Sequence, residues 1–140
     1  MTPAATLALQ EYRRRKAAFD DAVNARGYPR ERAEANLACW LSLALAAGVP
    51  PSECGAALAH WQAERGLTDS WARHILLWEG PAEADWHAEL ARAHAAARAK
   101  MESHPGNPDA LRRYLALDCI LHHLGLAARA PAAAEERIAA

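Results

Sequence analysis

Apolar side chains recur at helical spacing along most of the chain, and this spacing predicts a helical protein. Four of them, Leu9, Tyr12, Phe19 and Val23, fall on one stripe of the segment 3–26, as on the buried face of an amphipathic helix. A thinner stripe in the segment 81–103 consists of Trp86, Leu90, Ala93, Ala97 and Met101. From residue 37 to residue 47 the chain is apolar on every side, which is typical of a helix at the centre of a bundle.

Proline and glycine divide the chain into about six predicted helices. Proline is favoured at the first position of a helix and glycine just after the last. The segments bounded in this way are 3–26, 29–47, 50–65, 68–79, 81–103 and 108–124. The third of them is expected to begin at Pro50 or Pro51, and the sixth is expected to be capped by Asn107.

We therefore predict an all-α fold, a single-domain irregular or orthogonal bundle of about six helices around a central apolar helix at about residues 29–47. Alanine, the best helix former, supplies much of the 52% hydrophobic content, while the β-branched residues that favour sheets are few. The bundle is expected to span residues 1–125. The Ala-rich tail at 126–140 is expected to be frayed or to form a short helix.

Charge and cysteine content limit the classes of protein to which the chain can belong. The net charge is −1, so we expect no nucleic-acid partner, because binders of phosphate backbones usually carry a basic excess. Three cysteines without a CxxC pair favour neither a disulfide framework nor a zinc site and suit the cytoplasm. The longest apolar run is too short for a bilayer. The basic run at 13–16 has acidic neighbours and is interpreted as a solvated helix face.

The predicted fourth helix carries the main candidate for a binding surface. Trp71, Ile75 and Trp78 share one face, and Leu76 and Leu77 lie elsewhere on the same short helix. This is more apolar surface than a small monomer easily encloses. The sequence therefore predicts a soluble interaction or regulatory protein that acts through a helical surface, binds a protein partner or forms a homodimer, and has no enzymatic activity.

The segment 51–80 supports a first alternative, because it resembles a helix-turn-helix unit. Gly66 would be the turn glycine, Leu67 the buried turn residue, and Ala72 an inward position of the second helix. The resemblance implies a DNA-binding regulator. The segment departs from the pattern at Gln62 and Arg65, and its second helix offers Trp and Leu instead of polar groups that read bases.

A pair in the sixth predicted helix supports a second alternative, a small helical enzyme or ligand-binding bundle. Asp118 and His122 are four positions apart and can meet across one helical turn. A carboxylate beside a histidine is half of a general-base arrangement. The structural interpretation is a local hydrogen bond, or a contact between Asp118 and a neighbouring helix, sealed from solvent by Leu111, Leu115 and Leu121.

No motif in the chain predicts a cofactor or a metal. The sequence contains no Gly-rich phosphate loop and no GxSxG segment. Its seven histidines include no His-x-x-x-His or Glu-x-x-His spacing, and His87 and His94 stand about 10 Å apart on a helix axis. We therefore expect neither a metal site nor a cofactor.

Overall fold

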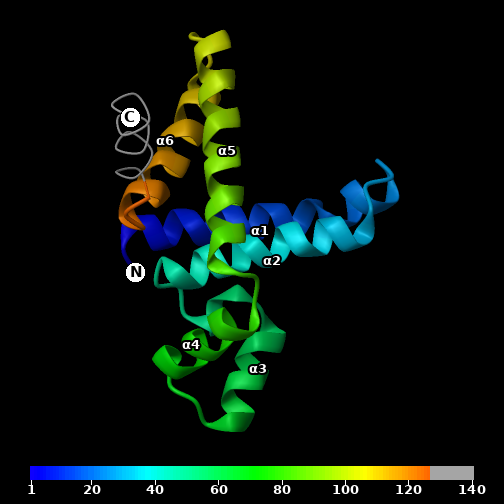
Figure 1. Ribbon diagram of the computed structural model, residues 1–140, viewed down its shortest axis with the longest axis vertical. Coiled ribbons are helices and arrows are strands. Elements are labelled where there is room, and N and C mark those ends of the chain that lie inside the picture. The colour runs from blue at the N-terminus through cyan, green and yellow to red at the C-terminus, as the bar shows by residue number, and fades with distance from the viewer. Residues whose placement is uncertain (127–140) are drawn as a thin grey trace, which may run out of the picture.

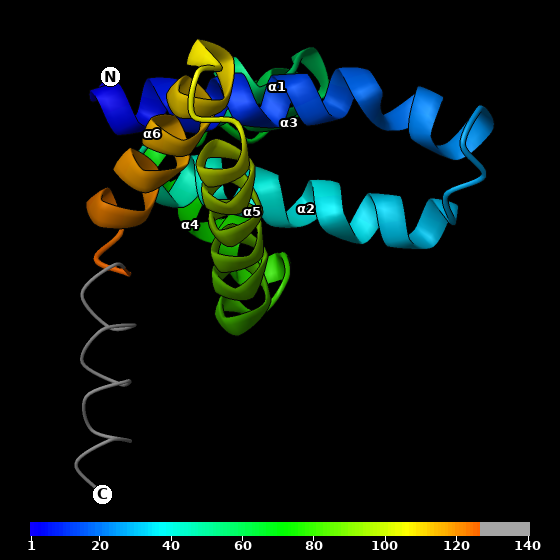
Figure 2. The same cartoon turned by 90° about the horizontal axis from the view of Figure 1, so that it is seen from above.

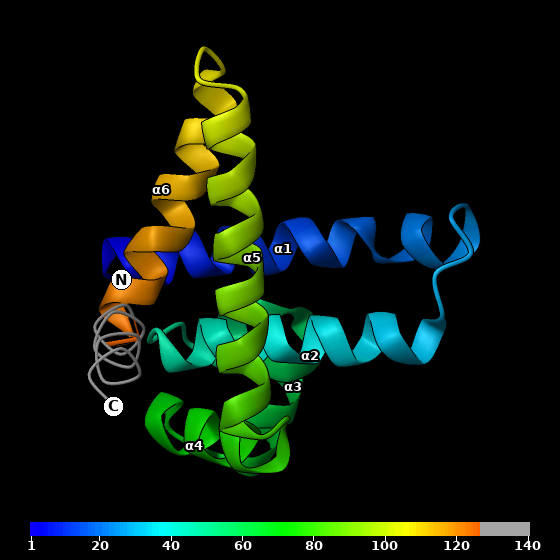
Figure 3. The same cartoon turned by 45° about the horizontal axis from the view of Figure 1, so that its top comes forward.

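Helix α1 (Pro3–Asn24) and helix α2 (Arg30–Ala46) form an antiparallel hairpin. Helix α1 starts where the Thr2 hydroxyl accepts a hydrogen bond from the N–H of Ala5, with a proline at the first helical position. The computed structural model describes residues 1–126. The far end of the hairpin extends beyond the rest of the molecule, as Figures 2 and 3 show.

A short 3₁₀ helix, η1 (Pro51–Cys54), leads into helix α3 (Ala56–Arg65) and helix α4 (Asp69–Glu79). Gly66 ends α3 in the left-handed conformation with φ of 60°, which costs a glycine little. The Thr68 hydroxyl then caps α4 by accepting from the N–H of Trp71. Helix α3 packs chiefly against η1, and α4 packs against α2 and η1.

Helix α5 (Glu83–Ser103) runs crosswise to the hairpin, and helix α6 (Pro108–His123) returns beside it (Figure 1). Asn107 caps α6 by accepting from the N–H groups of Asp109 and Ala110. Helix α6 packs against both α5 and α1. The predicted stripe of α5 is confirmed, because four of its five residues are buried and Met101 is half-buried.

The core lies where the hairpin meets α5 and α6. Its largest fully buried side chains are Trp40, Leu43, Leu45, Val49, Pro51, Leu90, Leu117 and Ile120. Helix α2 contacts α1, α4 and α5, and none of its residues from 37 to 46 is exposed. The prediction of an all-α single-domain bundle around a central apolar helix is therefore confirmed: residues 1–126 form six α-helices and no strand.

The third predicted helix needs a correction. It does not begin at Pro50 or Pro51 but at Ala56, after the separate 3₁₀ turn. Gly55 breaks the two apart with φ of 151°, a conformation that side-chain-bearing residues rarely adopt. The expected frayed or helical tail lies, beyond Leu126, outside the residues that the structure describes.

Within residues 1–126, no helix has both the length and the apolar character needed to cross a bilayer.

Candidate functional site

The outer face of α4 is an exposed aromatic surface. Trp71 is 62% exposed and Trp78 is 84% exposed, although tryptophan is normally well covered in a folded protein. His74 lies between them in sequence, is exposed, and places its ring edge-to-face against Trp71 at 5.8 Å between centroids. Ile75 is half-buried. We call Trp71, His74, Ile75 and Trp78 the α4 stripe.

The inner face of α4 packs against the rest of the molecule. Ala72 is fully buried, which lets α4 approach its neighbours closely. Leu76 and Leu77, expected as part of the binding surface, are half-buried and pack against the core instead. The five apolar residues of the sequence prediction are thus divided between two faces, and His74 was not among them.

Asp118 and His122 occupy a partly exposed flank of α6. The Asp118 carboxylate lies 3.5 Å from Nε2 of His122, whose side chain is 66% exposed. Its closer partner is His94 of α5, with 3.0 Å between Nε2 and Oδ1. The His94 ring also lies 5.2 Å from the ring of Tyr114, centroid to centroid. Asp118 therefore bridges two histidines, one from its own helix and one from α5.

The expectation that leucines seal this pair from solvent is wrong in part. Leu111 is 45% exposed and Leu115 is 52% exposed, while Leu121 is buried as expected. The buried residues of α6 are Ala110, Leu117, Ile120 and Leu121, and this helix packs against α5 and α1. The expectation that Leu111 and Leu115 would be covered is therefore wrong.

A buried carboxylate, Glu11, joins α1 to α6, although its place beside the basic run 13–16 suggested a solvated helix face. Glu11 of α1 is 8% exposed. Its carboxylate accepts two hydrogen bonds from Arg113 of α6 at 2.9 and 3.0 Å, and one from Nε of Arg15 at 2.9 Å. The fork of Arg113 matches both oxygens, which is the strong bidentate geometry. The spacing of Glu11 and Arg15 was visible in the sequence, whereas the contact to Arg113 was not.

A second covered carboxylate, Glu89 of α5, connects three helices. It accepts from Nε1 of Trp40 in α2 at 3.2 Å and from Nε of Arg92 at 3.0 Å, and it lies 3.7 Å from Nη1 of Arg15 in α1. The Arg15 guanidinium lies over the Trp40 ring, 4.1 Å from its centroid. The basic run at 13–16 is therefore not simply a solvated face, because Arg15 is drawn into the molecule.

Hydrogen bonding decides the ionisation of Glu89. Burial favours its neutral form, but hydrogen bonds, led by that from Arg92, favour the carboxylate more strongly. The pKa of Glu89 therefore lies below its ordinary value. Glu89 is a firmly held anion that positions two guanidinium groups, those of Arg15 and Arg92.

The class of the protein follows from its fold alone, an all-α helical bundle. No family model matches the chain, and neither does any curated protein or any solved structure. Among residues 1–126, no three His, Cys, Asp or Glu side chains converge in a group that could hold a metal ion.

Proposed function

We propose that this protein is a small interaction protein that assembles as a homodimer through the α4 stripe. The observation that carries the proposal is the exposure of two tryptophans, Trp71 and Trp78, on one side of one short helix. Indole rings dominate the energetics of many interfaces, because they bury a large area and lose little conformational freedom. Leaving two in water within one patch costs free energy that a contact with another chain would recover.

The α4 stripe can pair with a second copy of itself. Two-fold symmetry pairs identical surfaces. When a helix packs antiparallel against its own copy, each residue faces the residue that lies equally far on the other side of the midpoint. Trp71 and Trp78 are equally far from a midpoint between His74 and Ile75. An antiparallel copy of α4 therefore sets Trp71 opposite Trp78 of the second chain, and His74 opposite Ile75. Two residues on one helical face always meet this condition, so the stripe is compatible with a second copy of this chain.

The area available makes the dimer a weak one. The two exposed tryptophans supply on the order of 300 Å² per chain. A standard stable interface buries about 800 Å² per partner, and weaker, transient contacts bury less. We therefore expect a dimer that dissociates on dilution.

The DNA-binding alternative receives less support from the same segment. The turn between α3 and α4 has the left-handed glycine of a helix-turn-helix unit. However, residues 51–80 carry four carboxylates against two arginines, so this segment would repel a phosphate backbone. Its second helix offers indole rings where base-reading side chains would be needed.

Sedimentation velocity over a wide range of protein concentration tests the homodimer. We expect the wild-type chain to shift from monomer to dimer as its concentration rises, and the double variant Trp71→Ala, Trp78→Ala to stay monomeric. Both side chains are exposed, so their removal should leave the fold intact, which circular dichroism checks. The matched control is Leu111→Ala, Leu115→Ala, which removes two exposed apolar side chains from α6.

Two outcomes would overturn this function. A wild-type chain that stays monomeric at the highest concentration would exclude the dimer. A dimer that the control variant weakens as much as the tryptophan variant would place the contact elsewhere than α4.

A further inference from the structure

A cationic hollow of about 400 Å³ lies between α1, α5 and the start of α6. Its basic lining residues are Arg14, Arg15, Arg92, Lys100 and Arg113. One carboxylate, Asp109, also lines it and already pairs with Arg112 at 3.3 Å. The whole chain has a net charge of −1, so this concentration of positive charge is a local feature of the fold.

Two of these arginines, Arg113 and Arg92, form hydrogen bonds with the covered carboxylates of Glu11 and Glu89. Glu11 takes two N–H donors of Arg113, and Glu89 takes two of Arg92. A guanidinium has five N–H donors, so each of these arginines keeps others for a ligand. Lys100 has no ion pair among the residues that the structure describes. Even with Glu11 and Glu89 counted, five cations face three carboxylates, and this excess favours an anion in the hollow.

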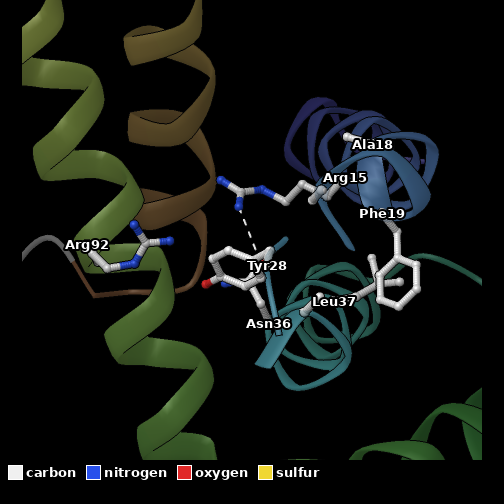
Figure 4. Close-up of a pocket in the computed structure, with 9 residues that line it drawn as sticks. Arg15, Ala18, Phe19, Tyr28, Asn36, Leu37 and Arg92 are labelled. Carbon is white, nitrogen blue, oxygen red and sulfur yellow. Dashed lines mark hydrogen bonds between the residues drawn. The ribbon is translucent and has the colours of Figure 1, made fainter. Parts of the chain in front are cut away.

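A second, mostly apolar hollow of about 250 Å³ adjoins the first. Phe19 and Leu37 line one end of it, between the two helices of the hairpin, and Tyr28 and Arg92 line the other, as Figure 4 shows. Arg15 and Arg92 line both hollows. The two spaces are therefore neighbours across a shared pair of arginines, with one end apolar and aromatic and the other cationic.

We propose that these two hollows form one binding site for a small phosphorylated ligand with a flat apolar body, the chemistry of a nucleoside diphosphate. Its phosphates would occupy the cationic hollow, because guanidinium forks match phosphate oxygens. Its apolar body would pack beside Phe19 and Tyr28. The combined volume falls in the range of ordinary small-molecule sites, which is about 300–1,000 Å³. This site is separate from the α4 stripe, so it stands or falls independently of the homodimer.

Isothermal titration calorimetry with three probes tests the two halves of the site. The probes are inorganic pyrophosphate, adenosine diphosphate and adenosine, each titrated into the full chain in metal-free buffer. We expect saturable binding of pyrophosphate that weakens with added salt, because screening reduces contacts between charges. Adenosine diphosphate should bind more tightly than pyrophosphate, and adenosine more weakly than either.

Lys100 and Arg98 provide a matched pair of variants on α5. Lys100 lines the cationic hollow, whereas Arg98 does not line it and pairs with Glu102 at 3.0 Å. Both side chains are exposed enough to be replaced without unfolding. We expect Lys100→Gln to weaken pyrophosphate binding by about tenfold, and Arg98→Gln by less than about twofold.

The variant Tyr28→Ala tests the apolar hollow separately from the cationic hollow. It should weaken the binding of adenosine diphosphate by about tenfold and leave that of pyrophosphate unchanged. Absence of saturable binding for both phosphate probes would overturn the site. Equal losses of pyrophosphate affinity in the Lys100 and Arg98 variants would show that the binding is non-specific electrostatic attraction. Equal affinities for pyrophosphate and adenosine diphosphate would remove the apolar half.

Discussion

The three cysteine thiols differ in how the surrounding residues cover them. Cys39 and Cys54 are buried, and Cys119 of α6 is partly exposed. Burial raises the pKa of the Cys54 thiol to about 11, with the nearby Arg13 acting in the opposite direction. Its Sγ donates to the carbonyl of Pro50 at 3.8 Å. The thiolate is the nucleophile, so the buried Cys54 thiol is unreactive near neutral pH.

We expect iodoacetamide to distinguish these thiols in the native protein. Cys119 should be alkylated first, and Cys54 should stay unmodified until the protein is unfolded in denaturant. Mass spectrometry of peptides taken at intervals measures the order. Alkylation of native Cys54 as fast as that of Cys119 would contradict the burial of Cys54.

Asp118 shows what a sequence reveals about a single polar side chain and what it does not. Its contact with His122 follows from helical geometry, because residues four positions apart share a face. Its shorter contact, with His94, joins α5 to α6 and depends on how these helices are rotated against each other. That rotation is set by the packing of many apolar side chains, so no local spacing predicts it.

At the scale of the helices, glycine and proline predicted most of the boundaries because they act locally. Gly66 ends α3 as expected, and Pro108 starts α6 as expected. The start of the third helix was predicted wrongly, because two consecutive prolines, Pro50 and Pro51, suit a 3₁₀ turn as well as a first α-helical turn. Gly55 could have revealed the break, but a glycine inside a helical pattern is often tolerated.

Helix α2 should be the most sensitive element to truncation of an apolar side chain. Leu43 is fully buried, whereas Leu41 is only partly buried in the same helix. We expect Leu43→Ala to lower the free energy of unfolding by about 2–5 kcal/mol, because it removes buried methyl groups and leaves a cavity. Leu41→Ala is the matched control and should cost less than about 2 kcal/mol. Urea denaturation followed by circular dichroism measures both values. Equal losses would show that α2 is not buried on the side of Leu43.

At the scale of the whole molecule, covered carboxylates tie together helices that lie far apart in sequence. Glu11 joins α1 to α6, and Glu89 joins α5 to both α1 and α2. The sequence predicted the fold class and the shared face of Trp71, Ile75 and Trp78 on α4, because helical periodicity is a local property. It could not predict these ion networks or the cationic hollow, since each combines residues from two or three helices.

The network around Glu89 should make stability depend on pH. The pKa of Glu89 in the folded protein is lowered, so its carboxylate stabilises the fold above the ordinary carboxyl pKa. This contribution is lost as the pH falls through the lowered pKa. We expect Glu89→Gln to reduce the free energy of unfolding at neutral pH by about 1–3 kcal/mol, because it weakens charged hydrogen bonds to Arg92 and Trp40.

The difference between wild type and Glu89→Gln should shrink as the pH falls, because a protonated Glu89 resembles glutamine. Urea denaturation of both proteins across an acid series measures it. Glu102→Gln is the matched control: Glu102 is exposed on the same helix and pairs only with Arg98 among the described residues. Its loss should change stability by less than about 1 kcal/mol at any pH. If the Glu89 difference persists unchanged in acid, the side chain stabilises the fold through packing, and its charge does not join the helices.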